Sequence, residues 1–149
     1  MTRIVSDVKR IDSEIAPVYA FISDFNRLGE LIKMARRGEQ AGELAGKIEE
    51  VRTTGDTCTF VVAGFGEVGM KIEERQEPTL VKFGGDGRLP FAFNVWIQLL
   101  EHAPGDTRLR VTCEAGLNMM MKMMLKGKLE KGIDQLAEGL ARLPYALMH

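Results

Sequence analysis

Apolar and polar residues change their spacing along the chain and so predict the order of its elements. Residues Arg3–Ile11 are rich in Ile and Val and predict a first strand. Apolar residues at helical spacing follow and predict a first helix, with Ser13 as its N-cap. Pro17 lies in the first turn, where the missing N–H of proline costs no hydrogen bond. Residues Leu28–Ala35 predict a second short helix, and the glycines of Gly38–Gly46 predict a loop.

From Lys47 to Gly116 the chain consists of six short runs typical of strands. The turn signals that separate them are Gly55-Asp56, Gly64-Phe65-Gly66, Glu77-Pro78, the loop Gly84–Pro90, and Pro104-Gly105-Asp106. Apolar and polar residues alternate in several runs, so one face of the sheet is apolar and the other is polar. Sequential hairpins with one apolar face predict an antiparallel meander whose apolar side another element must cover.

A long amphipathic helix predicted at Met119–Leu143 supplies that cover. Asn118 is its expected N-cap, and Pro144 ends it. Its leucines and isoleucine recur at helical spacing, with lysines and glutamates between them. Three glycines weaken this helix relative to alanine, so we expect a bend or a close packing contact there. They are Gly127, Gly132 and Gly139.

Composition places these elements in one compact unit. The chain has 149 residues, 45% of them hydrophobic, which predicts a single domain over residues 1–149 with one sizeable core. The net charge of -1 provides no overall field for nucleic acid. Two cysteines, Cys58 and Cys113, form no disulfide framework or metal cluster. We find no signal peptide and no apolar stretch long enough to span a membrane, so the expected location is the cytoplasm.

The order of elements resembles a known superfamily. One strand, two short helices, six strands in hairpin sequence and a long helix are similar to the helix-grip architecture of START-like (SRPBCC) proteins, which include polyketide cyclase/dehydrase-like and lipid-transport members. Local sequence agrees in the segment Val18–Phe25, the strand Pro90–Leu99 and the tail Leu129–Tyr145, which resemble small bacterial members, notably of Bacteroidetes type. The resemblance covers nearly the whole chain but carries no catalytic signature.

The resemblance implies an α+β fold in which a seven-stranded antiparallel sheet curves around the C-terminal helix, with two short helices between strands 1 and 2. It also implies an apolar cavity between sheet and helix. Members of the superfamily bind lipids, sterols, polyketides or hormones there, some catalyse cyclisation or hydrolysis, and others act through protein partners. The resemblance therefore indicates a class of ligand without naming one.

The residues expected to line the cavity share an inward phase on the predicted strands and the predicted helix. They are Phe60, Val62, Val68, Met70, Ile72, Phe83, Phe93, Val95, Ile97, Val111, Cys113, Met120, Met124, Leu129 and Ile133. Two interpretations stay open at this point. The same side chains either surround a ligand-sized cavity or fill a close-packed core.

The run Met119–Met124, interrupted only by Lys122, is the most unusual feature of the sequence. Methionine is flexible and polarisable, so such a run suits the mouth of a pocket, ordinary packing or an exposed partner surface. Binding of copper(I) is disfavoured because consecutive methionines point around a helix instead of converging. The lysines of the same region either meet an anionic head group or solvate the helix. They are Lys122, Lys126, Lys128 and Lys131.

Residues suited to acid–base or nucleophilic chemistry are few. His102 adjoins a turn and His149 is terminal, so we expect neither in the cavity. Glu74 is in phase with the inward residues of its strand and is the best candidate for a buried carboxylate, although a solvated position at the rim is the simpler interpretation. The loop Gly84–Pro90 lacks the context of a phosphate site and reads as a hairpin connection or a gate. We therefore predict no catalytic residues, no cofactor and no metal.

Trp96 is in phase with polar residues and should lie on the outer face of the sheet. It either anchors a partner, such as a second copy in a homodimer, or is half covered by neighbouring side chains. The leading hypothesis is a non-catalytic protein that binds a small hydrophobic or amphipathic ligand. The alternative is a protein-interaction module without a ligand, and a weaker alternative is an enzyme of the polyketide cyclase or hydrolase type.

Overall fold

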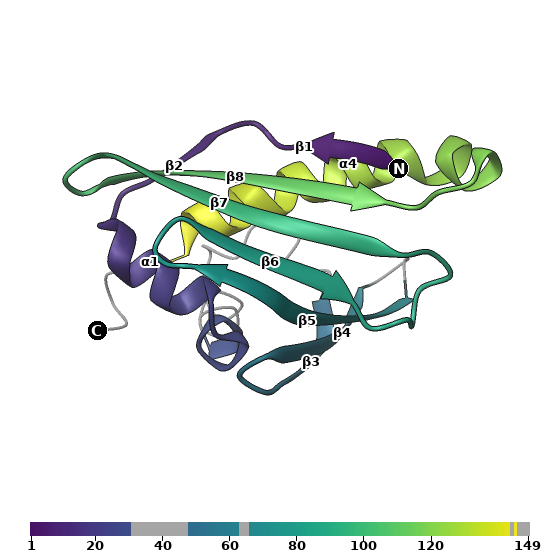
Figure 1. The fold of residues 1–149 in the computed structure, drawn as a ribbon, viewed down its shortest axis with the longest axis horizontal. Coiled ribbons are helices and arrows are strands. Elements are labelled where there is room, and N and C mark those ends of the chain that lie inside the picture. The colour runs from purple at the N-terminus through teal and green to yellow at the C-terminus, as the bar shows by residue number, and fades with distance from the viewer. Residues whose placement is uncertain (31–47, 63–65, 144, 146–149) are drawn as a thin grey trace.

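A computed structural model describes residues 1–30, 48–62, 66–143 and 145, apart from the side chains of 48–50 and 62 (Figure 1). It shows an α+β fold in which an antiparallel sheet curves beside one long helix, as in a helix-grip protein. The fold class predicted from the sequence is confirmed.

The six predicted runs of the middle of the chain form six strands. They are β3 (Ile48–Thr53), β4 (Thr57–Val62), β5 (Gly66–Gln76), β6 (Leu80–Gly85), β7 (Phe93–Ala103) and β8 (Asp106–Ala115). Each pairs antiparallel with the next one along the chain, which makes the predicted meander. The tight turn between β7 and β8 needs a glycine, since Gly105 has a φ of 74°.

The predicted first strand is two strands in the structure, β1 (Thr2–Val5) and β2 (Lys9–Ile11). Both pair with β8 at the edge of the sheet. Ser6 divides them, because its backbone N–H donates to the carbonyl of Val111 over 2.8 Å while its hydroxyl accepts from the N–H of Val111 at 2.9 Å. The side chain of Ser6 thus takes the place of a backbone partner, and the strand bends there.

Helix α1 (Ile15–Ile22) begins one residue later than expected. Glu14 is the N-cap, and Ser13 is not, because the carbonyl of Ser13 is held by the hydroxyl of Thr107 at 2.8 Å. Residues 25–30 are helical and begin a second helix, but the rest of the predicted helix Leu28–Ala35 and the predicted loop Gly38–Gly46 lie outside the described residues.

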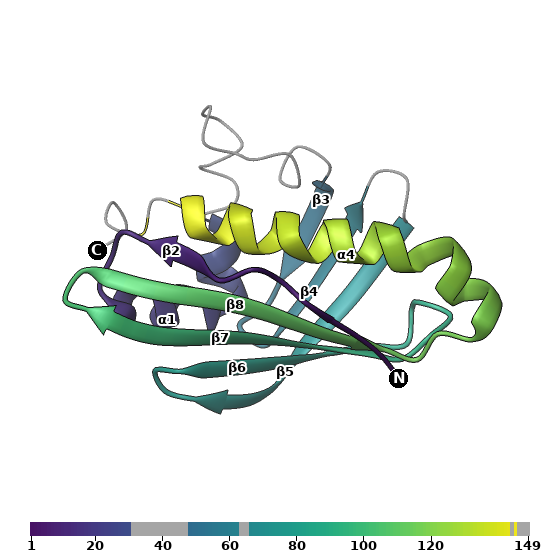
Figure 2. The same cartoon turned by 90° about the horizontal axis from the view of Figure 1, so that it is seen from above.

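Helix α4 (Met119–Arg142) has nearly the predicted bounds. Asn118 caps it as predicted, since its side-chain oxygen accepts from the N–H of Met121 at 2.8 Å. The helix lies against β1, β2 and β8 at one side of the sheet (Figure 2). Its buried residues are Ile133, Ala137 and Leu140, all in the C-terminal half.

Candidate functional site

The apolar face of the sheet, which we call the inner face, is the one covered by α1 and α4. Register places one row of apolar side chains across five strands. The row is Ile4, Cys113, Val95, Phe83 and Ile72. Phe25, just after α1, packs on Phe83 with 5.2 Å between ring centroids. Burial of this row and its neighbours forms the core.

The structure buries about half of the residues predicted to line a cavity. Those buried are Val68, Phe83, Val95, Ile97, Val111, Cys113 and Ile133. Five others are only partly buried, and they are Phe60, Met70, Ile72, Phe93 and Leu129. The side chain of Val62 lies outside the described part of the structure.

Met120 and Met124 do not point inward as predicted. They are 71% and 67% exposed, because the first turns of α4 extend beyond the part of the helix that packs on the sheet (Figure 2). The helical spacing was predicted correctly, but it was taken to face the sheet in the first turns of α4, which extend past the part of the helix that packs on the sheet.

The partly buried apolar residues form the candidate binding surface. The strands β3, β4 and β5 provide Val51, Phe60, Met70 and Ile72. Helix α4 provides Leu129 and Leu136. Val51 and Leu136 are not among the lining residues predicted from the sequence, although Leu136 is in helical phase with Leu129. These side chains pack against the core and remain only partly buried.

Buried polar side chains already have hydrogen-bond partners within the protein. Among the described residues, every buried side-chain nitrogen or oxygen has a hydrogen-bond partner. Burial raises the pKa of the thiols of Cys58 and Cys113 to about 11, so both are protonated and unreactive at neutral pH. The surface therefore offers apolar contact and no ionised nucleophile from these cysteines.

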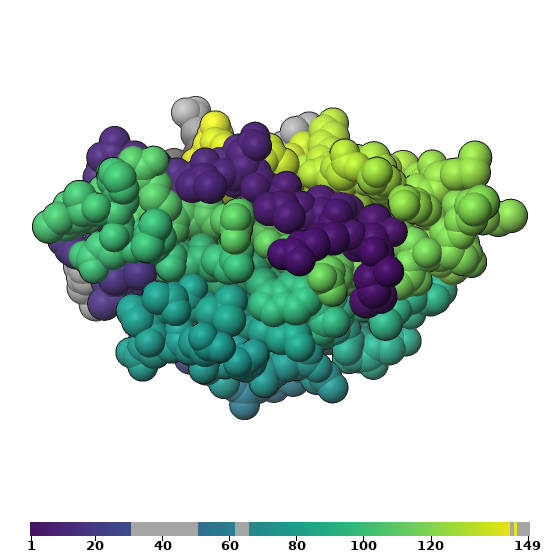
Figure 3. Space-filling model, turned by 45° about the horizontal axis from the view of Figure 1, so that its top comes forward, coloured from purple at the N-terminus to yellow at the C-terminus, as the bar shows by residue number. Residues whose placement is uncertain are grey.

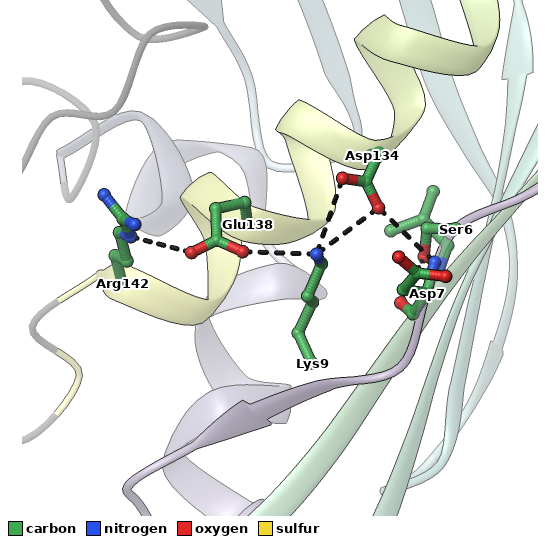
Figure 4. A network of polar contacts seen from close by, with 7 residues as sticks. Ser6, Asp7, Lys9, Asp134, Glu138 and Arg142 are labelled. Carbon is green, nitrogen blue, oxygen red and sulfur yellow. Dashed lines mark hydrogen bonds and ion pairs between the residues drawn. The ribbon is translucent and has the colours of Figure 1, made fainter.

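A polar clamp holds the C-terminal half of α4 on the sheet edge (Figure 4). The ammonium group of Lys9 lies 3.3 Å from Asp134 and 3.2 Å from Glu138. Glu138 also accepts from Arg142 at 2.9 Å, and the backbone N–H of Asp7 donates to Asp134 at 3.4 Å. Burial lowers the pKa of Lys9, but the hydrogen bonds to Glu138 and Asp134 outweigh it, and the pKa is raised.

Glu74 points away from the inner face and is exposed, so the simpler interpretation, a solvated carboxylate, holds and the buried-carboxylate alternative is wrong. The pairing of β5 with β6 shifts register between Ile72 and Glu74, and Glu74 pairs with Lys82 on the outer face. A bulge adds one residue and reverses the phase of all that follow. Glu74 is exposed and accepts from Gln76 at 2.7 Å.

Trp96 lies on the outer face, as its phase predicts. Its cross-strand neighbours are Lys82 and Thr112. The ammonium group of Lys82 lies 5.5 Å from the centre of the indole ring, within the range of a cation–π contact. Trp96 is therefore half-buried by its neighbours, and the interpretation of partial cover fits the structure.

The loop between β6 and β7 encloses a shallow hollow of about 510 Å³. Its lining includes Glu73, the glycines of this loop and the segment Leu89–Asn94. The loop is tied down, because Arg88 donates to Asp86 at 2.8 Å and to Glu67 on β5 at 2.6 Å. These bonds do not favour a gate.

The remaining candidate groups are dispersed. His102 is exposed near the end of β7, as expected. Within the described residues, no group of three His, Cys, Asp or Glu side chains is placed to hold a metal ion. In the same part of the chain, no helix is both long and apolar enough to cross a membrane.

Comparison with known proteins shows the fold. No protein-family model matches the sequence, and no curated protein matches it. TTHA0849 from Thermus thermophilus is 15% identical, with a TM-score of 0.69 over 99% of this chain and 100% of that one. Norcoclaurine synthase from Thalictrum flavum, in complex with dopamine and hydroxybenzaldehyde, is 12% identical, with a TM-score of 0.68 over 99% of this chain and 87% of that one. XoxI from Bacillus cereus is 15% identical, with a TM-score of 0.62 over 100% of this chain and 99% of that one. The helix-grip architecture is shared across these proteins.

Proposed function

We propose that this chain binds a small hydrophobic or amphipathic molecule, of lipid or polyketide-like type, between the inner face of the sheet and α4, and does not catalyse a reaction. The observation that carries the proposal is the set of partly buried apolar residues on β4, β5 and α4, among them Phe60, Ile72 and Leu129. The whole chain, residues 1–149, would act as one START-like domain around this site.

Packing energetics support the proposal. Apolar side chains left partly open on a concave surface gain free energy when a ligand covers them, at about 25 cal/mol per Å². Because the buried polar side chains described here already have partners, apolar contact would supply most of the affinity. A ligand with a polar end would orient that end toward solvent.

The shared fold adds a second line of support. The solved structure of norcoclaurine synthase is a complex with two small aromatic compounds, dopamine and hydroxybenzaldehyde. A helix-grip protein can therefore hold small ring compounds. We do not carry over catalysis, because His102 and Glu74, the two acid–base candidates of this chain that the structure describes, lie away from the inner face.

Native mass spectrometry of the purified protein, with organic extraction and mass analysis of any released compound, tests the proposal. We expect a discrete co-purifying hydrophobic compound, or saturable binding of an apolar fluorescent probe. Ile72→Glu should abolish that binding, whereas Leu100→Glu, a matched change at a residue 63% exposed on β7, should not.

The opposite result has a clear meaning. A clean apo mass, with no probe bound by the folded protein, would refute the ligand-binding proposal and favour the interaction module. Met70→Gln provides a milder inner-face variant in case Ile72→Glu unfolds. Circular dichroism of each variant separates loss of binding from loss of folding.

A further inference from the structure

The start of α4 exposes four methionines to solvent. Met119, Met120, Met123 and Met124 are 81%, 71%, 83% and 67% exposed. Residues one, four and five positions after Met119 lie on the same face of the helix as Met119, since successive residues are rotated by about 100° around the helix axis. These side chains therefore make one apolar strip over two helical turns, which we call the methionine strip. A contiguous exposed apolar surface of this kind usually marks an interaction site.

Lysines border the methionine strip. Lys122 and Lys126 lie on one side of it by helical phase, and Lys128 lies on the other, all exposed. The segment Met119–Lys131 contains four lysines and one acidic residue, Glu130, whereas the whole chain has a net charge of -1. Positive charge is thus concentrated on this part of an otherwise acidic molecule.

The N-terminus extends the same apolar end of the protein. Met1 is 74% exposed, and its sulfur lies 3.6 Å from the position that a Cβ on Gly116 would take. Gly116, just before the helix, donates its N–H to the carbonyl of Ala92 at 2.8 Å. Figure 3 shows the N-terminal residues and the start of α4 on the same side of the molecule.

We propose that the start of α4 docks on the surface of a membrane that contains anionic lipids. The methionine strip enters the boundary between head groups and acyl chains, while the lysines on its two sides contact lipid phosphates. The proposal goes beyond ligand binding and does not require it.

The positive charge at the start of α4 favours a lipid surface over a protein partner or a second copy of this chain. A second copy of this chain docked on the strip would bring its lysines against the lysines of this one, and like charges oppose such a contact. A protruding helix with an apolar strip between lysines instead suits a flat anionic surface, where each lysine adds electrostatic attraction. Such binding weakens as salt rises.

Co-sedimentation with vesicles tests the proposal. We expect the protein to bind vesicles containing phosphatidylglycerol, to release them as salt rises, and to bind phosphatidylcholine vesicles weakly. Replacing the four methionines of the strip with Gln, which keeps helix propensity, should lower the partition coefficient at least about tenfold. Lys122→Glu with Lys128→Glu should do the same, whereas Lys71→Glu with Arg110→Glu, on exposed sheet positions, should change it much less.

Three outcomes would overturn the proposal. The protein could fail to bind anionic vesicles at low salt, or the methionine variant could bind them as well as the parent does. Light scattering could instead show that the protein dimerises through this helix. Ile72→Glu separates this test from the ligand-binding test, because that inner-face variant should keep vesicle binding. Circular dichroism checks that each variant is folded.

Discussion

Lys9 and Glu138 are 129 positions apart in the chain, yet the Nζ of Lys9 lies 3.2 Å from the Oε2 of Glu138. The contact joins the edge strand β2 to the C-terminal half of α4 (Figure 4). Burial and ion pairing both occur in this half, whereas the first turns of α4 are exposed. These ion pairs therefore anchor the C-terminal half of the helix to the edge of the sheet.

Lys9→Met should reduce the free energy of unfolding by about 1 kcal/mol. The Lys9 side chain is only 18% exposed, and its removal leaves Asp134 and Glu138 close together without their cation. Urea denaturation measures the change. Lys71→Met, on an exposed position of β5, is the control and should have little effect. Equal stability of the two variants would show that the clamp does not stabilise the fold.

Stability should fall in acid partly through Glu138. The hydrogen bond from Lys9 lowers the pKa of Glu138 below its ordinary value of 4.5. Between the folded and the unfolded pKa of Glu138, the unfolded chain binds more protons at this site than the folded chain does. The stabilisation is therefore fully present above about pH 4.5 and is lost as pH falls through the lower folded pKa.

Thermal melts of Glu138→Gln between neutral and acid pH check this expectation. The variant should be less stable at neutral pH and should lose less stability on acidification than the parent. Glu101→Gln, at an exposed position of β7, serves as the control. A parallel pH profile for Glu138→Gln and the parent would contradict the linkage.

Glycines of α4 should tolerate alanine, whereas one glycine of the sheet should not. Among the described residues, a Cβ on Gly127, Gly132 or Gly139 would meet no atom within 4 Å, so each alanine should stabilise the protein by about 0.5–1 kcal/mol. No close packing contact in the described part of the chain therefore explains these glycines. A Cβ on Gly69 would overlap the carboxylate of Asp86, which Arg88 holds at 2.8 Å.

Differential scanning calorimetry of these variants gives the test. The three helix variants should raise Tm, and Gly69→Ala should lower it. A fall in Tm for Gly127→Ala would indicate that the exposed start of α4 requires flexibility or a contact that the free protein lacks.

The fluorescence of Trp96 should distinguish the inner face from the outer face. It is the only tryptophan of the chain, and Lys82 covers its ring on the outer face. A ligand on the inner face should therefore leave its emission maximum nearly unchanged, whereas Lys82→Leu should alter it. A large shift on ligand binding would place the ligand, or a coupled change, at the outer face.

The sequence by itself determined the order of elements and the apolar phase of most strands. Alternation fixes which side chains of β7 and β8 face inward, because successive residues of a strand point to opposite faces. The same alternation predicted the position of Trp96, and the capping preference of asparagine predicted the cap at Asn118. Local periodicity reports which face of an element is apolar, whereas the helix-grip architecture was expected because the order of elements resembles that of a known superfamily.

Only the tertiary structure decided where each apolar face is covered. Periodicity does not show that the sheet ends before the first turns of α4, and so it placed Met120 and Met124 inside. It also does not show the bulge after Ile72, which turned Glu74 outward, or the hydroxyl of Ser6, which divided the first strand. Each of these depends on a partner distant in sequence, because burial and register are properties of two elements in contact and not of one.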